Sequence, residues 1–313
     1  MGQIKVLYIA GANRCGSTLL ARLLGDLPGF VAIGEGLVHF FRASADFHVP
    51  CGCGLNVRSC AFWRDVSIPR SVEQSWARWL RLRRAPLLDY HRRRHPEQTS
   101  ELISSLSRLY EAIAERAGAE VIVDSSKSPL HARMLSWVPN IDLHVVFLVR
   151  DPRSVVFSCS KPKEWLPGAS PLRATKSWMG LTLGSEYLRT RVPQWRTLRY
   201  EDFVREPKLM TLQIAADLGY GSAQVPFINE SLAQLGPQHM LGSNPDKFKS
   251  GPTRIVEQSA SLPWGSRALV SILTAPLLWR YGYWGKARRK DSEAVTTPVT
   301  VVPEMVGEVA KRD

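Results

Sequence analysis

The sequence has no apolar stretch long enough to cross a lipid bilayer as a helix. Its longest apolar run, residues 268–278, is too short for a span and is interrupted by Ser271, Thr274 and Pro276. Residues 1–10 also lack the basic region and apolar core of a secretory signal, and their pattern is instead that of a β-strand. These absences argue against an integral membrane protein, and we expect a soluble, cytoplasmic one.

Cysteine is scarce, with five residues in the chain, and an odd count at this length is not a disulfide framework. Three of the five are grouped in a segment rich in cysteine and glycine, as Cys51, Cys53 and Cys60. A zinc site is one interpretation of this group, with His48 close by in the sequence, but the spacing lacks a clear fourth ligand. The other interpretation, a lid loop that lines a cleft, is the one we adopt, so the sequence predicts no metal ligand.

Acidic residues are too few to balance the basic ones, since 28 Asp and Glu stand against 41 Lys and Arg. The net charge of +13 favours a negative partner, which includes a nucleotide, a nucleic acid, an anionic lipid surface and an acidic substrate. Charge alone does not choose among these partners. Hydrophobic residues make up 44% of the chain, which excludes disordered and fibrous classes and suffices for a full core.

Strand-like and helix-like segments alternate along the chain, and no internal repeat is present. Apolar runs such as VIVD and LHVVFLV are continuous rather than alternating, which is typical of strands buried on both faces of a parallel sheet. We therefore predict a three-layer α/β/α fold with a central parallel sheet. The predicted strands are residues 5–10, 30–34, 121–124, 143–149 and 194–200.

The chain is expected to form a single domain over residues 1–285. Within it, residues 48–115 read as an insertion that contains the cysteine-rich loop and then arginine-rich helices with a break near Pro86. Residues 244–253 are rich in lysine and in turn formers and predict a basic loop. Residues 286–313 are charged and then mixed without periodicity, so we predict a disordered tail.

A glycine-bearing turn, GANRCGST, lies between the first predicted strand and the first predicted helix. Its G-x-x-x-x-G spacing is that of a Walker-type loop, but Ser17 stands where that loop carries lysine. Such a turn directs successive N–H groups and the positive end of the helix dipole at one point. Thr18 adds a second hydroxyl, and Arg14 restores the positive charge. The sequence therefore predicts an anion site here, with a plain tight turn as the alternative.

A second anion site is predicted at Arg150, which directly follows the predicted strand of residues 143–149. A basic residue at the carboxyl end of a parallel strand lies at the edge where α/β sheets bind ligands. Ser158 follows eight residues later and adds a hydroxyl on the next helix. The alternative is that Arg150 merely pairs with Asp151 or Glu35. Two separated sites suit a donor with phosphates at both ends of its ribose, whereas a triphosphate needs one linear channel.

At these residues the chain resembles the sulfotransferases that use 3′-phosphoadenosine-5′-phosphosulfate (PAPS). GANRCGSTLLARLL resembles the 5′-phosphosulfate loop of that family, and VFLVRDPRSVVFS resembles its 3′-phosphate motif. PGFVAIGE is similar to the segment that presents a carboxylate in tyrosylprotein-type and many bacterial members, and VIVDSSKSP to the one that brings a lysine toward the transferring group. LRYEDF and NPDKFKSGP resemble segments that close over the nucleotide. The resemblance implies a P-loop NTPase-like sulfotransferase fold.

The resemblance also implies chemical roles. PAPS would be the donor, the acceptor would be a hydroxyl group of a small metabolite, sugar or lipid, and no metal would be required. Glu35 is implied as the general base, with Arg14 and Lys127 as charge stabilisers, while His39 and His131 are the other candidates for the base. The implied nucleotide-binding residues are Arg14, Cys15, Gly16, Ser17, Thr18, Arg150, Ser158, Tyr200, Lys247, Lys249, Ser250 and Gly251.

Two other functions are weighed against this one. A P-loop kinase would use Asp124 to hold Mg²⁺, but it needs a lysine at the position of Ser17. A nucleic-acid-binding module would use the arginines of residues 73–95, with Trp76, Trp79 and Tyr90 to stack on bases. We do not favour nucleic acid as a partner, because a charge run on a helix is more often a solvated face. A peripheral contact with a membrane surface stays open, and the sequence does not give the oligomeric state.

Overall fold

The computed structural model describes residues 3–36, 50–66, 85–162, 168–242, 244–257 and 261–284. Several sequence predictions concern residues outside these ranges. They are the base candidate His39, the possible zinc ligand His48, the stacking candidates Trp76 and Trp79, and the disordered tail of residues 286–313.

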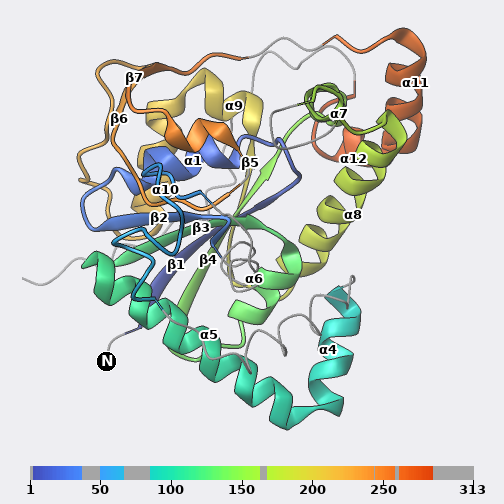
Figure 1. Ribbon diagram of the computed structural model, residues 1–313. Coiled ribbons are helices and arrows are strands. Elements are labelled where there is room, and N and C mark those ends of the chain that lie inside the picture. Colours follow the sequence, from blue (N-terminus) through green and yellow to red (C-terminus); the bar gives the residue numbers. More distant parts are fainter. Residues whose placement is uncertain are drawn as a thin grey trace, which may run out of the picture.

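A five-stranded sheet forms the centre of the described structure, with all strands parallel in the order β2-β3-β1-β4-β5 (Figure 1). The strands are β1 (Ile4–Gly11), β2 (Phe30–Gly34), β3 (Val121–Lys127), β4 (Ile141–Val149) and β5 (Gln194–Arg199). Consecutive residues of β1 belong to different core clusters, since Leu7 packs on one face and Tyr8 on the other. This burial on both faces explains the continuous apolar runs within β1, β3 and β4.

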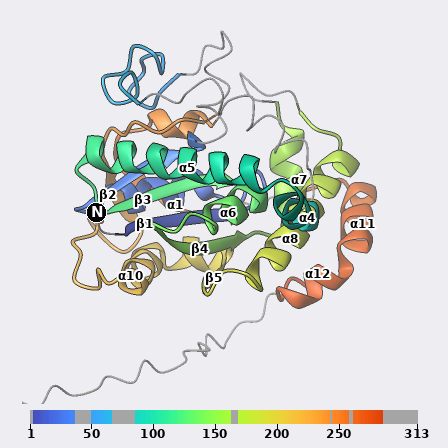
Figure 2. The ribbon, with the colours of Figure 1, turned by 90° about the horizontal axis from the view of Figure 1, so that it is seen from below.

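Helices cover both faces of the sheet, so the predicted three-layer α/β/α fold is confirmed (Figures 1 and 2). One face packs against α1 (Ser17–Gly25), α9 (Tyr200–Arg205) and α10 (Pro207–Asp217). The other packs against α5 (Pro96–Ala117), α6 (Pro129–Leu135) and α8 (Pro171–Arg189). The helix α7 (Pro152–Ser160) follows β4 and contacts α8.

The described part of the predicted insertion contributes a helix to the main core. Pro86 lies in the first turn of α4 (Ala85–Arg94), where its missing N–H has no intrahelical partner to lose. A second break follows at His95, because Pro96 begins α5 at a position that favours proline. The apolar stripe of α5 is buried against the sheet through Leu102, Leu106, Leu109, Tyr110 and Ile113.

The segment predicted as a basic loop contains regular structure. The strand β7 (Gly251–Arg254) pairs with β6 (Leu232–Leu235) in an antiparallel ribbon, and a 3₁₀ helix, η1 (Pro245–Phe248), lies between them. The guanidinium of Arg22 on α1, only 1% exposed, donates to the carbonyls of Gly236 and Asp246. These bonds fix the ribbon beside α1, a contact between distant segments that local turn formers do not reveal.

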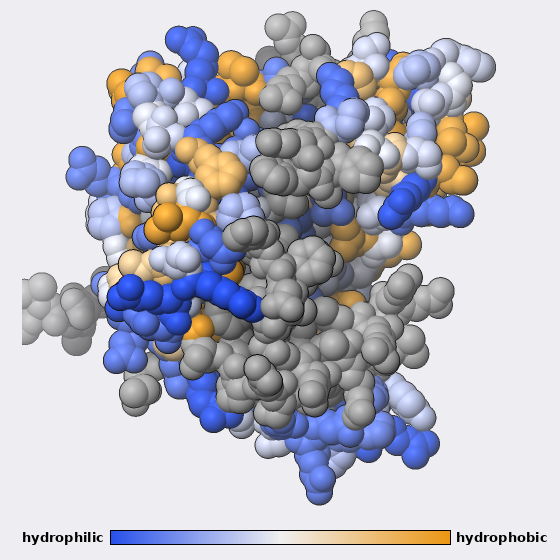
Figure 3. Space-filling model, in the orientation of Figure 1, coloured by the Kyte–Doolittle hydropathy of each residue, from blue (hydrophilic) through white to orange (hydrophobic). Residues whose placement is uncertain are grey.

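Apolar side chains are exposed on α11 (Trp264–Leu273) and α12 (Ala275–Arg280). The largest exposed fractions belong to Trp264 at 86%, Trp279 at 78% and Ile272 at 73%, and part of this surface is orange in Figure 3. None of the helices that the structure describes is both long and apolar enough to cross a membrane.

A pH-dependent loss of stability is expected from His131, which is buried in α6. Burial lowers the pKa of His131 from 6.5 to about 4, so between these values the unfolded chain binds the proton more tightly than the folded one. The free energy of unfolding should therefore fall by about 2 kcal/mol between pH 7 and pH 5 through this group. In His131→Leu this contribution should vanish, as measured by denaturant unfolding at both pH values. The exposed His95→Gln should keep the wild-type difference, and an unchanged difference in His131→Leu would refute the assignment.

Candidate active site

A cavity of about 1170 Å³ lies at the carboxyl edge of the central sheet. All five strands lead into it, because residues at or directly after their carboxyl ends line its wall. This is the edge at which parallel sheets bind ligands. The predicted site residues in the lining are Arg14, Gly16, Ser17, Thr18, Glu35, Lys127, Arg150, Ser158, Tyr200 and Lys249.

The turn between β1 and α1 is held in a strained and close-packed form. Gly16 has φ +100°, and a Cβ added there would lie 2.5 Å from the ring of Tyr200. Arg14 has φ +66°, in the left-handed region that costs a non-glycine residue about 1 kcal/mol or more. The N-cap residue of α1 is Gly16, which has no side chain to cap the N-terminus of the helix. This arrangement fits a cradle for an anion.

Arg150 lies beside that turn and is only 7% exposed. Its Nη1 donates to the carbonyl oxygen of Arg14 at 3.0 Å, and its guanidinium lies 4.2 Å from the centre of the Tyr200 ring. Its Nε is buried and has no hydrogen-bond partner in the described part of the chain. Arg150 does not pair with Asp151, the alternative considered from the sequence, because the carboxylate of Asp151 forms an ion pair with Arg153 at 2.6 Å. Arg150 is thus a buried cation whose Nε–H group has no acceptor among the described residues.

Glu35 and Lys127 meet at the ends of β2 and β3. Nζ of Lys127 lies 2.5 Å from Oε1 of Glu35, and the two side chains are 10% and 19% exposed. Lys127 has φ +67°, so its backbone is strained in the same way as that of Arg14. The amide of Glu35 donates to the carbonyl of Leu241 at 2.7 Å. A carboxylate and an ammonium are therefore held together at the cavity wall.

Four residues predicted to bind the nucleotide do not belong to the described lining: Cys15, Lys247, Ser250 and Gly251. Cys15 is fully buried behind the turn, and its N–H donates to the carbonyl of Ala12. Lys247 is 3% exposed, because its Nζ donates to the carbonyls of Pro50 and Gly242, both at 2.5 Å. Of the two predicted lysines, Lys249 lines the cavity. Lys247 instead links the backbone at Pro50 to the backbone at Gly242.

Sequence reasoning missed several polar residues of the cavity. Arg173 on α8 and Arg254 on β7 add positive charge, and Ser126 on β3 adds a hydroxyl. Asn244 also lines the wall, where its Nδ2 donates to Oγ1 of Thr18 at 3.2 Å. Arg254 extends the basic segment already singled out, whereas nothing in the local sequence of α8 marks Arg173.

The kinase hypothesis is not supported by the position of Asp124. Its side chain is fully buried and does not reach the described cavity wall. Its Oδ2 accepts a hydrogen bond of 2.5 Å from the hydroxyl of Tyr110, and its Oδ1 accepts one of 2.7 Å from the N–H of Ser126. Burial raises the pKa of Asp124 to about 6. The carboxylate thus belongs to a buried network rather than to a Mg²⁺ site.

Among the described residues, neither the stacking candidate Tyr90 nor the base candidate His131 lines the cavity. The guanidinium of Arg94 lies over the ring of Tyr90 at 5.5 Å, and the hydroxyl of Tyr90 accepts a hydrogen bond from that arginine. The other stacking candidates, Trp76 and Trp79, lie outside the described residues. His131, a candidate for the general base, is 2% exposed and is buried in α6.

A family model described as "Sulfotransferase family" matches residues 7–222, which contain the turn after β1, Glu35, Lys127 and Arg150. A search of the curated proteins finds no match.

Among solved structures, the sulfotransferase domain from the curacin biosynthetic pathway is 17% identical, with 88% of this chain and 98% of that chain covered and a TM-score of 0.49. A sulfotransferase from Alicyclobacillus acidocaldarius is 15% identical, with 88% and 94% covered and a TM-score of 0.42. The sulfotransferase domain of the Synechococcus PCC 7002 olefin synthase is 18% identical, with 70% and 74% covered and a TM-score of 0.42.

Proposed function

The chain belongs to the sulfotransferase family, and from this membership we propose that it transfers the sulfuryl group of PAPS to a hydroxyl group of a small metabolite, sugar or lipid. One observation carries the proposal: Arg14 and Arg150, which follow the adjacent strands β1 and β4, line the same cavity. Two cations that follow different strands and line one cavity suit one small ligand with anionic groups at two ends. The Glu35–Lys127 pair in the same wall offers the groups that the transfer needs.

The residues present fit such a donor. The buried Nε of Arg150 has no acceptor among the described residues, and a phosphate oxygen would satisfy it. The uncapped N-terminus of α1 offers N–H groups to a second anion, with the hydroxyls of Ser17 and Thr18 beside them. We assign the 3′-phosphate to Arg150 and Ser158, and the 5′-phosphosulfate to the turn that carries Arg14.

PAPS supplies an activated sulfuryl group, with adenosine 3′,5′-bisphosphate as the leaving group. The chain has to remove the proton of the acceptor hydroxyl and to counter negative charge on the departing phosphate oxygen. We assign the first task to the carboxylate of Glu35. We assign the second to the ammonium of Lys127, the guanidinium of Arg14 and the N–H groups of the turn. The ion pair of 2.5 Å then keeps the two tasks at one point of the cavity.

A thermal-shift comparison tests the choice of donor. Adenosine 3′,5′-bisphosphate should raise the melting temperature more than 5′-ADP or ATP with Mg²⁺ at equal concentration, because only the first ligand has both anionic ends of the donor. By mass action, a concentration 100 times the Kd stabilises the folded state by about 2.7 kcal/mol. Equal or greater stabilisation by ATP with Mg²⁺ would contradict the PAPS proposal and favour the kinase hypothesis.

A further inference from the structure

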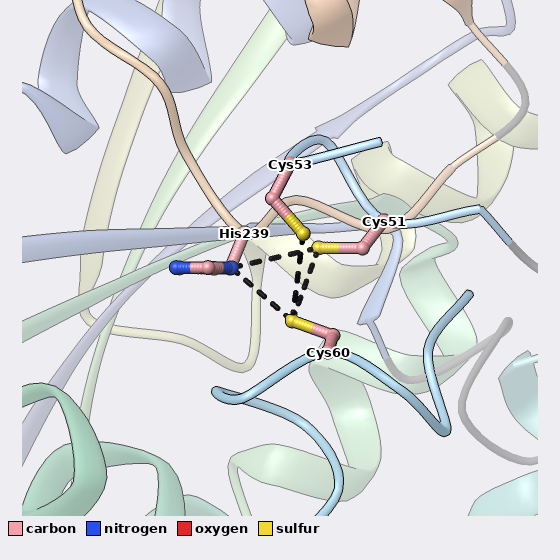
Figure 4. Close-up of side chains that lie close together, drawn as sticks. All are labelled: Cys51, Cys53, Cys60 and His239. Atoms are coloured by element: carbon pink, nitrogen blue, oxygen red, sulfur yellow. Dashed lines mark hydrogen bonds between the residues drawn. The ribbon is translucent and has the colours of Figure 1, made fainter. Parts of the chain in front are cut away.

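Three cysteines and one histidine converge away from the cavity just described (Figure 4). The Sγ atoms of Cys51, Cys53 and Cys60 and the Nδ1 atom of His239 all lie within 4.8 Å of one another. Cys60 Sγ is 3.6 Å from Cys51 Sγ, 3.7 Å from Cys53 Sγ and 3.2 Å from His239 Nδ1. Cys51 Sγ is 3.7 Å from His239 Nδ1. We call these four residues the Cys₃His cluster.

The spacing of these atoms is that of ligands around one metal ion. With Zn–S bonds of about 2.3 Å and a Zn–N bond of about 2.0 Å, neighbouring ligands of a tetrahedral site are about 3.5–3.8 Å apart. Of the six pairs that the four ligand atoms form, three fall in this range and the Cys60–His239 pair, at 3.2 Å, is slightly shorter. The other two pairs lie within 4.8 Å. The sulfur atoms are too far apart for a disulfide, whose S–S bond is about 2.0 Å. All three cysteines are free.

The cysteine-bearing segment is folded so that its three sulfur atoms point toward one another, with Cys51 and Cys60 buried and Cys53 exposed (Figure 4). The N–H of Cys51 donates to the carbonyl of Leu55, and that of Gly54, at φ +87°, donates to the carbonyl of Cys51. The N–H of Cys60 donates to the carbonyl of Asn56. These bonds make two successive turns and bring Cys60 back to Cys51, and both of these side chains are fully buried.

The histidine is oriented by the two residues at positions 62 and 63, shortly after Cys60. Phe62 stacks on the ring of His239 with a centroid distance of 5.2 Å and an interplanar angle of 6°. The indole Nε1 of Trp63 donates to the carbonyl of His239 at 2.6 Å. These contacts do not involve the sulfur atoms, so the ring is positioned toward the thiols independently of them. Orientation by surrounding residues is what a built metal site requires.

We propose that the Cys₃His cluster binds one Zn²⁺ as a structural site. Three thiolates and an imidazole are ligands that zinc prefers, and thiols on their own form only weak hydrogen bonds with one another. Four protein ligands complete a tetrahedron and leave no open position, so the ion is structural rather than catalytic. The proposal departs from the metal-free loop adopted from the sequence, because His239, far from the cysteines in the sequence, supplies the fourth ligand that the cysteine spacing lacked.

The ion would fasten the segment of residues 50–66 to the strand edge that carries Glu35. Next to His239, Met240 accepts a hydrogen bond of 2.9 Å from the N–H of Gly52. Leu241 follows and bonds to both sides of Gly34, accepting from the N–H of Glu35 and donating to the carbonyl of Ile33. A metal at the cluster therefore supports the backbone that presents Glu35, although it does not touch the cavity.

Metal analysis of the full chain tests the proposal. Protein purified after growth with added zinc should contain about one Zn²⁺ per chain, and Co²⁺ exchanged into it should give the visible bands of a tetrahedral thiolate site. Cys60→Ser and His239→Ala should hold nearly no metal, whereas His239→Cys should retain it. The matched controls Cys159→Ser and His144→Gln, which alter residues outside the cluster, should retain the wild-type content.

Removal of the ion should also be visible in the backbone. A chelator should lower the melting temperature and should speed hydrogen exchange at the amides of Gly52 and Glu35, with no ligand or acceptor present. The proposal would be overturned if the wild-type protein contained no zinc and gave no visible bands with Co²⁺. It would also be overturned if the Cys60→Ser and His239→Ala variants held as much metal as the control variants. Should those variants fail to fold, the cobalt spectrum of the wild type and the chelator-dependent reactivity of its thiols decide the question.

Discussion

Replacement of Glu35 by glutamine should lower the turnover of sulfuryl transfer by about 10²- to 10⁴-fold, the usual contribution of a general base. Glutamine has nearly the same shape but cannot accept the proton of the acceptor hydroxyl. Because the donor is assigned to Arg14 and Arg150, the Kd of adenosine 3′,5′-bisphosphate should stay nearly unchanged. Steady-state kinetics with PAPS and calorimetric titration of the bisphosphate measure the two quantities separately.

Glu230→Gln is a suitable control, because Glu230 is 81% exposed and pairs with Lys208 away from the cavity. This variant should keep the wild-type turnover. A near-normal rate for Glu35→Gln would remove Glu35 from the proposed mechanism. A large loss of bisphosphate binding would instead indicate that Glu35 acts mainly by positioning Lys127, its partner in the ion pair.

Replacement of Arg150 by methionine should weaken binding of adenosine 3′,5′-bisphosphate by about 10- to 100-fold, because a hydrogen bond to a charged group contributes about 1.5–3 kcal/mol. Binding of 5′-AMP, which lacks the 3′-phosphate, should change much less. The selectivity between the two nucleotides should therefore collapse. This ratio is the informative measurement, because Arg150 also binds the carbonyl of Arg14 and its loss could loosen the whole turn.

A control for lost positive charge is Arg196→Met, since Arg196 pairs with Asp217 and does not line the cavity. Its selectivity for the bisphosphate should equal that of the wild type. If Arg150→Met lowered the affinities of both nucleotides by the same factor, the assignment of the 3′-phosphate to Arg150 would be wrong.

The sequence allowed the central layers to be predicted because their signals are local. The strands β1, β3 and β4 contain continuous apolar runs, at residues 6–10, 121–123 and 145–149, and burial on both faces of a parallel sheet favours that composition. The turn after β1 was equally visible, since its glycine spacing lies between a strand and a helix. Bounds were less accurate, as for β3, which extends three residues past the predicted Asp124 to Lys127.

The remaining features depend on contacts between residues far apart in the sequence. The strands β6 and β7 are short, and β7 contains glycine and proline, so they were not separable from a loop until their pairing was known. Lys247 lies in a basic motif, yet its ammonium is buried among carbonyls of other segments. His239 is 188 residues from Cys51, and no spacing rule links it to the cysteines.

By itself the sequence determined the layered α/β architecture, the phosphate-type turn and the arginine that follows β4, because each is encoded by neighbouring residues. The tertiary structure alone decided which groups meet: the Arg150 side chain with the backbone carbonyl of Arg14, Glu35 with Lys127, and the three cysteines with His239. The physical reason is that side chains on separate strands and loops come into contact only after the strand order and register are fixed. Those are set by packing of the whole core rather than by any local pattern.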